Sequence, residues 1–117
     1  METYNPIILG DKPKMFVKMS PLAGEYTLSS IEWSVTFYAS RGELTIAKSA
    51  ATKIDDDTYS VRVDTSKVGV GKLYGILYPR IPDSEVDEGF YVPPVPFDTG
   101  EEIVSPYNIV SYGLQNK

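Results

Sequence analysis

The sequence predicts one small all-β domain, an antiparallel β-sandwich, and three observations lead to this prediction. Apolar and polar residues alternate with a period of two in several segments, and turn signals separate these segments at spacings of about 10 to 15 residues. No segment has the i, i+3, i+4 apolar spacing of an amphipathic helix. A length of 117 residues, 42% of them hydrophobic and 23% charged, suits a single globular core.

The clearest strand signal covers residues 30–39, where apolar and polar side chains alternate without a break. Arg41-Gly42 then predicts a turn, and residues 43–49 continue the alternation as the hairpin partner. Two further strands are expected, an opening strand at residues 14–19 and a third at residues 58–64. Together these segments form the first half of the sandwich.

The next strand, residues 72–78, has apolar side chains on both faces, which is typical of a central strand. Asp64-Thr65-Ser66 before it could cap a short helical turn, but the glycines of residues 68–71 favour a loop. Residues 79–96 carry five prolines, which lack an amide donor and fix φ. We therefore expect a long proline-rich loop or arm after the central strand.

The remaining segments set the domain boundaries. Residues 103–104 and 108–112 are expected to supply one or two short final strands. We predict an N-terminal arm or edge strand at residues 1–12, the sandwich domain at 13–112 and a fraying tail at 113–117.

Composition excludes several classes of function. With 16 acidic and 11 basic residues the net charge is −5, which repels phosphate backbones and anionic lipid headgroups, so neither nucleic acid nor a membrane is expected as a partner. The chain has no cysteine and no histidine, so Ser-His, Cys-His and His-metal sites are excluded. The N-terminus lacks the pattern of a secretory signal, so we expect the mature chain to begin at Met1. No enzyme activity and no cofactor are predicted.

Two acidic clusters are the only candidates for a metal. Asp55, Asp56 and Asp57 offer carboxylates that could bind Ca²⁺, but aspartates in such a position more often form a solvated turn. A second cluster begins at Asp83 and resembles a calcium loop, yet Pro94 stands where that loop needs a bidentate glutamate. We therefore predict no metal site.

Candidate partner-binding residues lie in two places. Aromatic side chains beside glycines and prolines provide contact area at low entropic cost, whereas Trp33 lies among core residues and is interpreted as core. The apolar residues at 6–10 form either an edge strand of their own domain or an arm that adds to a neighbour's sheet. The predicted binding residues are Tyr74, Tyr78, Phe90 and Tyr91 in the second half, and Ile7, Ile8 and Leu9 near the start.

Four short elements stand out in the second half of the chain: Val63-Asp64-Thr65, the turn at residues 69–71, Ile81-Pro82-Asp83 and Asp98-Thr99-Gly100. With these elements, residues 61–104 resemble β-domains of virion proteins from tailed phages of gut Bacteroidetes. Together with residues 31–59 they also look like immunoglobulin-like domains of phage baseplate and fibre proteins.

The resemblance implies an immunoglobulin-like sandwich and a structural, non-enzymatic virion protein: an oligomeric adaptor, fibre-anchoring or capsid or tail decoration module. Its expected partners are other virion proteins and further copies of itself, and its expected location is the virion, assembled in the host cytoplasm. The sequence stops at Lys117 where fibre proteins continue into a shaft, so a receptor-binding role is not expected. The alternatives are a carbohydrate-binding or adhesion module, suggested by the aromatic residues, and a small glycosidase or peptidase using paired carboxylates.

Overall fold

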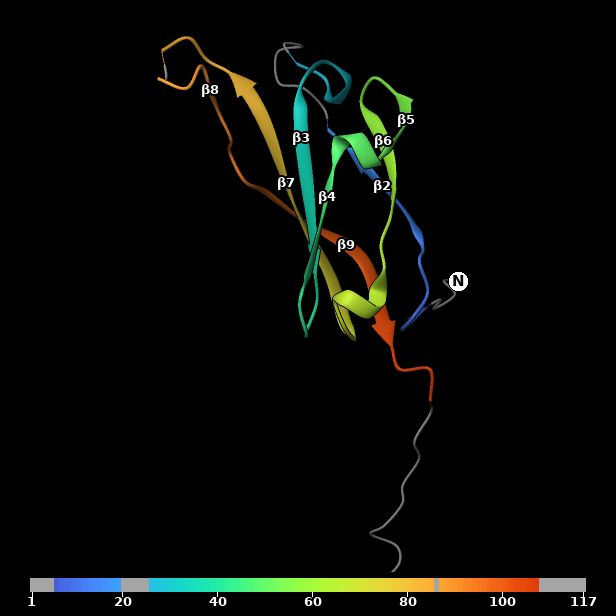
Figure 1. Ribbon diagram of the computed structural model, residues 1–117. Coiled ribbons are helices and arrows are strands. Elements are labelled where there is room, and N and C mark those ends of the chain that lie inside the picture. The colour runs from blue at the N-terminus through green and yellow to red at the C-terminus, as the bar shows by residue number, and fades with distance from the viewer. Residues whose placement is uncertain (1–5, 20–25, 86, 108–117) are drawn as a thin grey trace, which may run out of the picture.

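The computed structural model describes residues 6–19, 26–85 and 87–107, and these form two β-sheets packed face to face (Figure 1). The predicted all-β sandwich is confirmed. The larger sheet has the order β1 (Ile7–Ile8), β9 (Val95–Val104), β7 (Gly71–Pro82), β3 (Glu32–Tyr38) and β4 (Glu43–Ala47), with β8 (Phe90–Tyr91) paired to the outer end of β7. The smaller sheet has the order β2 (Lys14–Lys18), β6 (Thr58–Arg62) and β5 (Thr52–Asp55). Three short 3-10 turns are η2 (Leu28–Ser30), η3 (Lys48–Ala50) and η4 (Thr65–Lys67).

The hairpin of β3 and β4 is confirmed, and all strand pairs except one are antiparallel. The exception is β1, which runs parallel to β9 with Ile7 opposite Ile103. The amide of Leu9 extends this pairing by donating to the carbonyl of Val104 at 2.8 Å. Of the two alternatives for residues 6–10, the structure shows the edge strand of its own domain, and it makes the larger sheet mixed.

The core lies between the inner faces of the two sheets. Val35 and Phe37 from β3 and Leu73 from β7 are almost completely shielded from solvent. The Trp33 indole N–H donates to the carbonyl of Leu28 at 3.1 Å, and the ring meets Tyr59 of the smaller sheet edge-on at 5.1 Å. Trp33 is therefore a core residue, as predicted.

A short helical turn forms at η4, where we expected the glycines to favour a loop. The Asp64 side chain accepts from the backbone N–H of Ser66 and caps the turn, so the local capping signal outweighed the glycines that follow. The hydroxyl of Thr65 is fully buried, accepts from the Gly10 amide and donates to the Asp11 carbonyl, both at 2.8 Å. These bonds fasten the crossing from β1 to β2 onto η4.

The proline-rich segment contains more strand than predicted. β7 continues past Tyr78 to Pro82, and β9 begins at Val95, well before the expected final strand at residues 103–104. Among the described residues, β9 pairs with β7 only as far as Leu77, and most of the outer edge of β9 has no neighbouring strand. Prolines 79, 82 and 96 therefore lie where one side of the strand has no described partner. The predicted strand at residues 108–112 lies outside the described residues.

Candidate partner-binding surfaces

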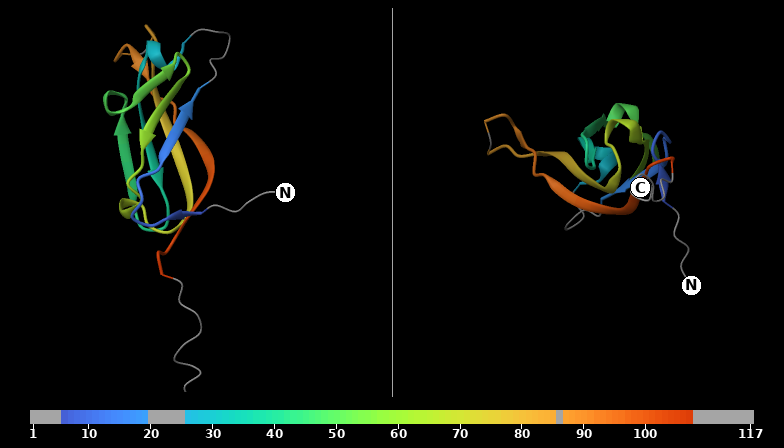
Figure 2. Two further views of the ribbon diagram at one scale, coloured as in Figure 1. Left: turned by 90° about the vertical axis from the view of Figure 1, so that its right-hand side faces the viewer. Right: turned by 90° about the horizontal axis from the view of Figure 1, so that it is seen from below.

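The most prominent surface is a projecting hairpin, which we call the arm and define as residues 79–95. It comprises the outer end of β7, the strand β8 and the connections around them. Figures 1 and 2 show it extending away from the body of the sandwich. The arm therefore presents both of its sides at a distance from the core.

Specific contacts hold the described part of the arm in shape. Ile81 pairs with Tyr91 and Pro82 with Phe90, and the Asp83 amide donates to the Gly89 carbonyl at 2.9 Å. The Arg80 guanidinium lies over the Phe90 ring, 3.7 Å from its centroid. A cation over an aromatic face at this distance is attractive, by about 0.5–1 kcal/mol at exposed sites. Prolines at both ends add stiffness to the hairpin.

The arm combines exposed apolar side chains with an acidic tip. Tyr91, Val92 and Val95 are each between 42% and 46% exposed. The tip carries four carboxylates, and residues 81–95 contain no lysine or arginine; the four are Asp83, Glu85, Asp87 and Glu88. Such a surface suits a partner with an apolar groove and a basic rim.

Tyr74 and Tyr78 do not lie on the arm but on the outer face of the larger sheet. Register places Tyr74 beside Tyr38 of β3 and Tyr78 beside Ser34. The rings of Tyr38 and Tyr74 stack with their centroids 5.7 Å apart. Both predicted tyrosines are half-buried, so they form a row on the sheet face rather than projecting anchors.

The other predicted binding residues divide between these regions. By register Phe90 follows Pro82 onto the same outer face as Tyr78, whereas Tyr91 lies on the opposite side of the arm. Ile7 and Leu9 pack against the core, and only Ile8, 39% exposed, is left at the edge. β1 lies against residues 103–104 of β9, at the other end of the sheet from the arm. The structure therefore does not join the two predicted groups into one site.

The first acidic cluster forms a turn that is held by protein groups. β5 extends through Asp55, so the turn is shorter than predicted and centres on Asp56 and Asp57. Asp56 forms an ion pair with Lys53 at 3.1 Å and accepts a hydrogen bond from the Ser29 hydroxyl at 3.0 Å. Both contacts lower the pKa of the Asp56 carboxyl group, and the hydrogen bond from Lys53 has the larger effect. Among the residues that the structure describes, no three acidic side chains gather in a way that could hold a metal ion.

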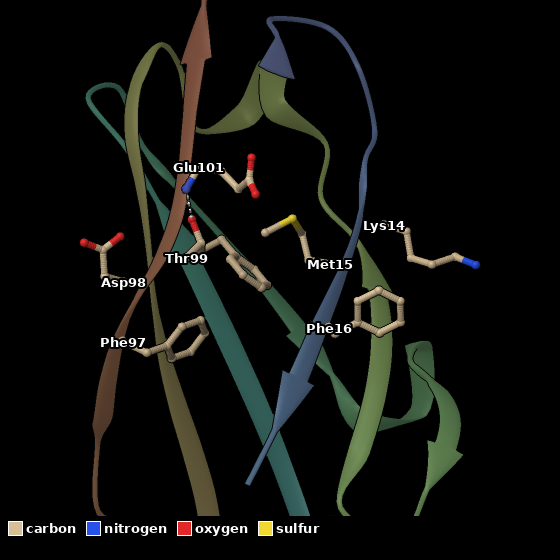
Figure 3. A pocket seen from close by; sticks show the side chains of 8 residues that line it. Lys14, Met15, Phe16, Phe97, Asp98, Thr99 and Glu101 are labelled. Carbon is tan, nitrogen blue, oxygen red and sulfur yellow. Dashed lines mark hydrogen bonds between the residues drawn. The ribbon is translucent and has the colours of Figure 1, made fainter. Parts of the chain in front are cut away.

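A further surface was not predicted from the sequence. β2 and β9 flank an opening between the two sheets, shown in Figure 3, which we call the seam. Two adjoining grooves of about 450 and 430 Å³ make up the seam. The apolar side chains that line it are Met15, Phe16 and Val17 from β2, Met19 just after β2, Val95 and Phe97 from β9, and Phe37 and Leu77 beneath them.

Comparison with known proteins gives no match: no family model, no curated protein and no solved structure matches the chain. The described part of the chain also contains no helix that is long and apolar enough to cross a membrane. The function is therefore inferred from the chain's own surfaces.

Proposed function

We propose that the chain is a non-enzymatic structural protein of a virion, an adaptor or decoration module that binds neighbouring particle proteins and further copies of itself. The observation that carries the proposal is the arm, a stiff projection with exposed apolar side chains and an acidic tip. Sequence resemblance to virion β-domains supports the particle as its location.

The arm is suited to insertion into a partner. Exposed Tyr91, Val92 and Val95 supply the apolar contact area that interfaces bury at their centre. The Asp83–Gly89 hydrogen bond and the Arg80–Phe90 contact order the hairpin before binding, which reduces the entropy lost in the complex. The carboxylates at the tip would then meet a basic rim and favour fast association.

The location is tested by mass spectrometry of purified particles of the virus that encodes the chain. We expect the chain in the particles at a copy number comparable to that of other structural proteins. Its absence from particles, when it is abundant in the infected cell, would overturn the proposal.

The arm is tested with a photo-crosslinking amino acid placed at Tyr91 and, as a matched control, at Ile54 on β5, which is likewise apolar and exposed. We expect the Tyr91 probe, and not the Ile54 probe, to crosslink to a second particle protein. Equal crosslinking from both positions would show that the arm is not the binding element.

The tyrosine row favours a second candidate, a carbohydrate-binding module. Tyr38, Tyr74 and Tyr78 share one sheet face, and aromatic rings with hydroxyls can contact sugar rings through both their faces and their polar ends. Titration with a panel of oligosaccharides tests this. Binding that is lost in Tyr74→Ala but kept in Tyr107→Ala, a variant at an exposed tyrosine elsewhere, would support the candidate; no binding to any glycan would remove it.

A further inference from the structure

Two strand edges without a neighbour face the seam. Within the described residues, β2 pairs only with β6, and β9 pairs on its outer side only at residues 103–104, where β1 lies. Figure 3 shows the two strands on opposite sides of the opening, with Met15 pointing into it from β2. An unpaired edge exposes amide and carbonyl groups that a further strand can satisfy.

The floor of the seam is apolar and incompletely covered, and the side chains of Lys14, Asp98, Thr99 and Glu101 also line one of its two grooves. Val17, Phe37 and Leu77 form its floor and are buried, but Val95 is 43% exposed and Phe97, Met15 and Met19 are partly exposed. Each groove has about three times the roughly 150 Å³ that holds a benzene ring in a protein cavity. The seam therefore has room for several apolar side chains from an added strand.

β2 provides the better edge for such a strand. Its five residues contain no proline, and its lysines at positions 14 and 18 alternate away from Met15 and Val17, so they leave the seam open. β9 is less suitable, because Pro96 lacks an amide and the pairing of β9 shifts register near Gly100, which has a φ of +78°. An added strand would extend the smaller sheet from three strands to four.

The chain itself contains a sequence that fits. Residues 108–114, Asn-Ile-Val-Ser-Tyr-Gly-Leu, alternate so that Val110, Tyr112 and Leu114 share one face of a strand. They carry no charge, so no ionised group loses its hydration on insertion. Seven residues span roughly 24 Å as a strand, against about 17 Å for the five residues of β2.

The direction of the chain after β9 favours a second copy as the donor. β1 occupies the edge of β9 at Val104, so the chain would have to cross β1 to turn straight back along its own β9. Residues 105–107 instead lead away from the body, and Tyr107 is 76% exposed (Figure 1). We propose that residues 108–114 of one copy add as a strand to the free edge of β2 in another copy and place Val110, Tyr112 and Leu114 in its seam.

This inference deepens the proposed function by giving the way in which copies join, and it rests on that function only for the assumption that the chain self-assembles.

The absence of cysteine allows a clean crosslinking test. One batch of full chain carries Met15→Cys and another carries Tyr112→Cys. After mixing and oxidation we expect a covalent dimer that needs both batches. A second pair, Met19→Cys with Tyr112→Cys, probes the other end of β2 and keeps the test valid if Met15→Cys folds poorly.

The control pairs Tyr112→Cys with Ile54→Cys, which is exposed on β5 away from the seam, and should give no dimer. Removal of residues 108–117 should raise the dissociation constant of the oligomer, measured by analytical ultracentrifugation, at least about tenfold. Two crosslinking results would overturn the inference. One is a chain with both Met15→Cys and Tyr112→Cys that forms an intramolecular disulfide and no dimer; the other is an equal yield of dimer from the control pair. A monomer whose Tyr91 probe still crosslinks to a particle protein would overturn the inference while the function of the arm stands.

Discussion

The sharpest test of the packing around the seam is the substitution Gly75→Ala. Gly75 is buried in β7 opposite Phe97 of β9, and the Phe97 ring lies over it. A Cβ atom at position 75 would lie 2.3 Å from Cζ of Phe97, whereas ordinary van der Waals contact begins near 3.4 Å. The ring would have to move by about 1 Å, and the open seam that Phe97 lines gives it room to do so.

The expected cost follows from these contacts. Overpacking in a filled core costs about 1–3 kcal/mol, and displacing Phe97 weakens its edge-on contact with Phe37, whose centroid is 6.0 Å away. Gly75 has no left-handed backbone conformation, so alanine also gains about 0.4–1 kcal/mol by restricting the unfolded chain. The net prediction is a destabilisation of about 1–2 kcal/mol.

Urea unfolding followed by the fluorescence of Trp33, the single tryptophan, measures this free energy. The control is the same substitution in a Phe97→Ala background, where the methyl group meets no ring. There Gly75→Ala should be neutral or stabilising by up to about 1 kcal/mol, which gives a coupling of about 2 kcal/mol between the two positions. Equal costs in both backgrounds would refute the assignment of Phe97 to the space above Gly75.

Three further substitutions test other parts of the fold. Thr65→Val should cost about 1–3 kcal/mol in urea unfolding, because the Gly10 amide loses its acceptor and the Asp11 carbonyl keeps only its bond from the Thr65 amide; Thr65→Ser should restore most of this stability, and an unaffected Thr65→Val would contradict the assignment. Trp33→Phe should cost about 2–4 kcal/mol in thermal unfolding followed by circular dichroism, because a buried carbonyl loses its donor and the core loses volume. The hydrogen bond from the Ser66 hydroxyl lowers the pKa of Asp64 below its usual 3.8 in the folded state. The ionised Asp64 therefore stabilises the fold at neutral pH, and this stabilisation is lost as the pH falls below 3.8. Asp64→Asn should therefore weaken the fall in urea midpoint between about pH 6 and pH 3, and an unchanged fall would count against the cap.

Local patterns were sufficient for the parts of the fold whose partners are near in sequence. The alternation in residues 30–39 and the turn at Gly42 predicted the hairpin of β3 and β4, because both strands and their turn are adjacent. The placement of Trp33 in the core followed from the same alternation. The cap at Asp64 was visible in the sequence, but the nearby glycines led us to expect a loop where the turn forms.

Features that depend on distant partners were not predictable in this way. The prolines at 93, 94 and 96 argued against a strand, and the open edge of β9 among the described residues explains why Pro96 is tolerated there. The parallel pairing of β1 with β9 joins the two ends of the described chain, which no local pattern encodes. Phe97 and Met15 gave no sign of a shared groove, because the seam arises only when the two sheets pack.

Aromatic residues near glycines and prolines were a useful but incomplete guide to the binding surfaces. Phe90 and Tyr91 lie on the arm, as a position between glycine and prolines suggested, whereas Tyr74 and Tyr78 follow the alternation of β7 onto the sheet face. Which side of the arm each ring occupies depends on the pairing of β8 with β7, and that register is set by the turn that Gly89 closes with a φ of +83°.

Binding of the purified chain to particles that lack it tests the central claim most directly. The measurement is the affinity of the wild-type chain, of an arm variant with Tyr91→Ser and Val92→Ser, which lie outside the seam, and of a control with Ile54→Ser and Val70→Ser at exposed positions outside the arm. We predict that the arm variant binds at least about tenfold more weakly, with an unchanged urea midpoint, and that the control binds like wild type. Equal binding by all three chains, or no binding by the wild-type chain, would contradict the assignment of this protein as a particle component held by its arm.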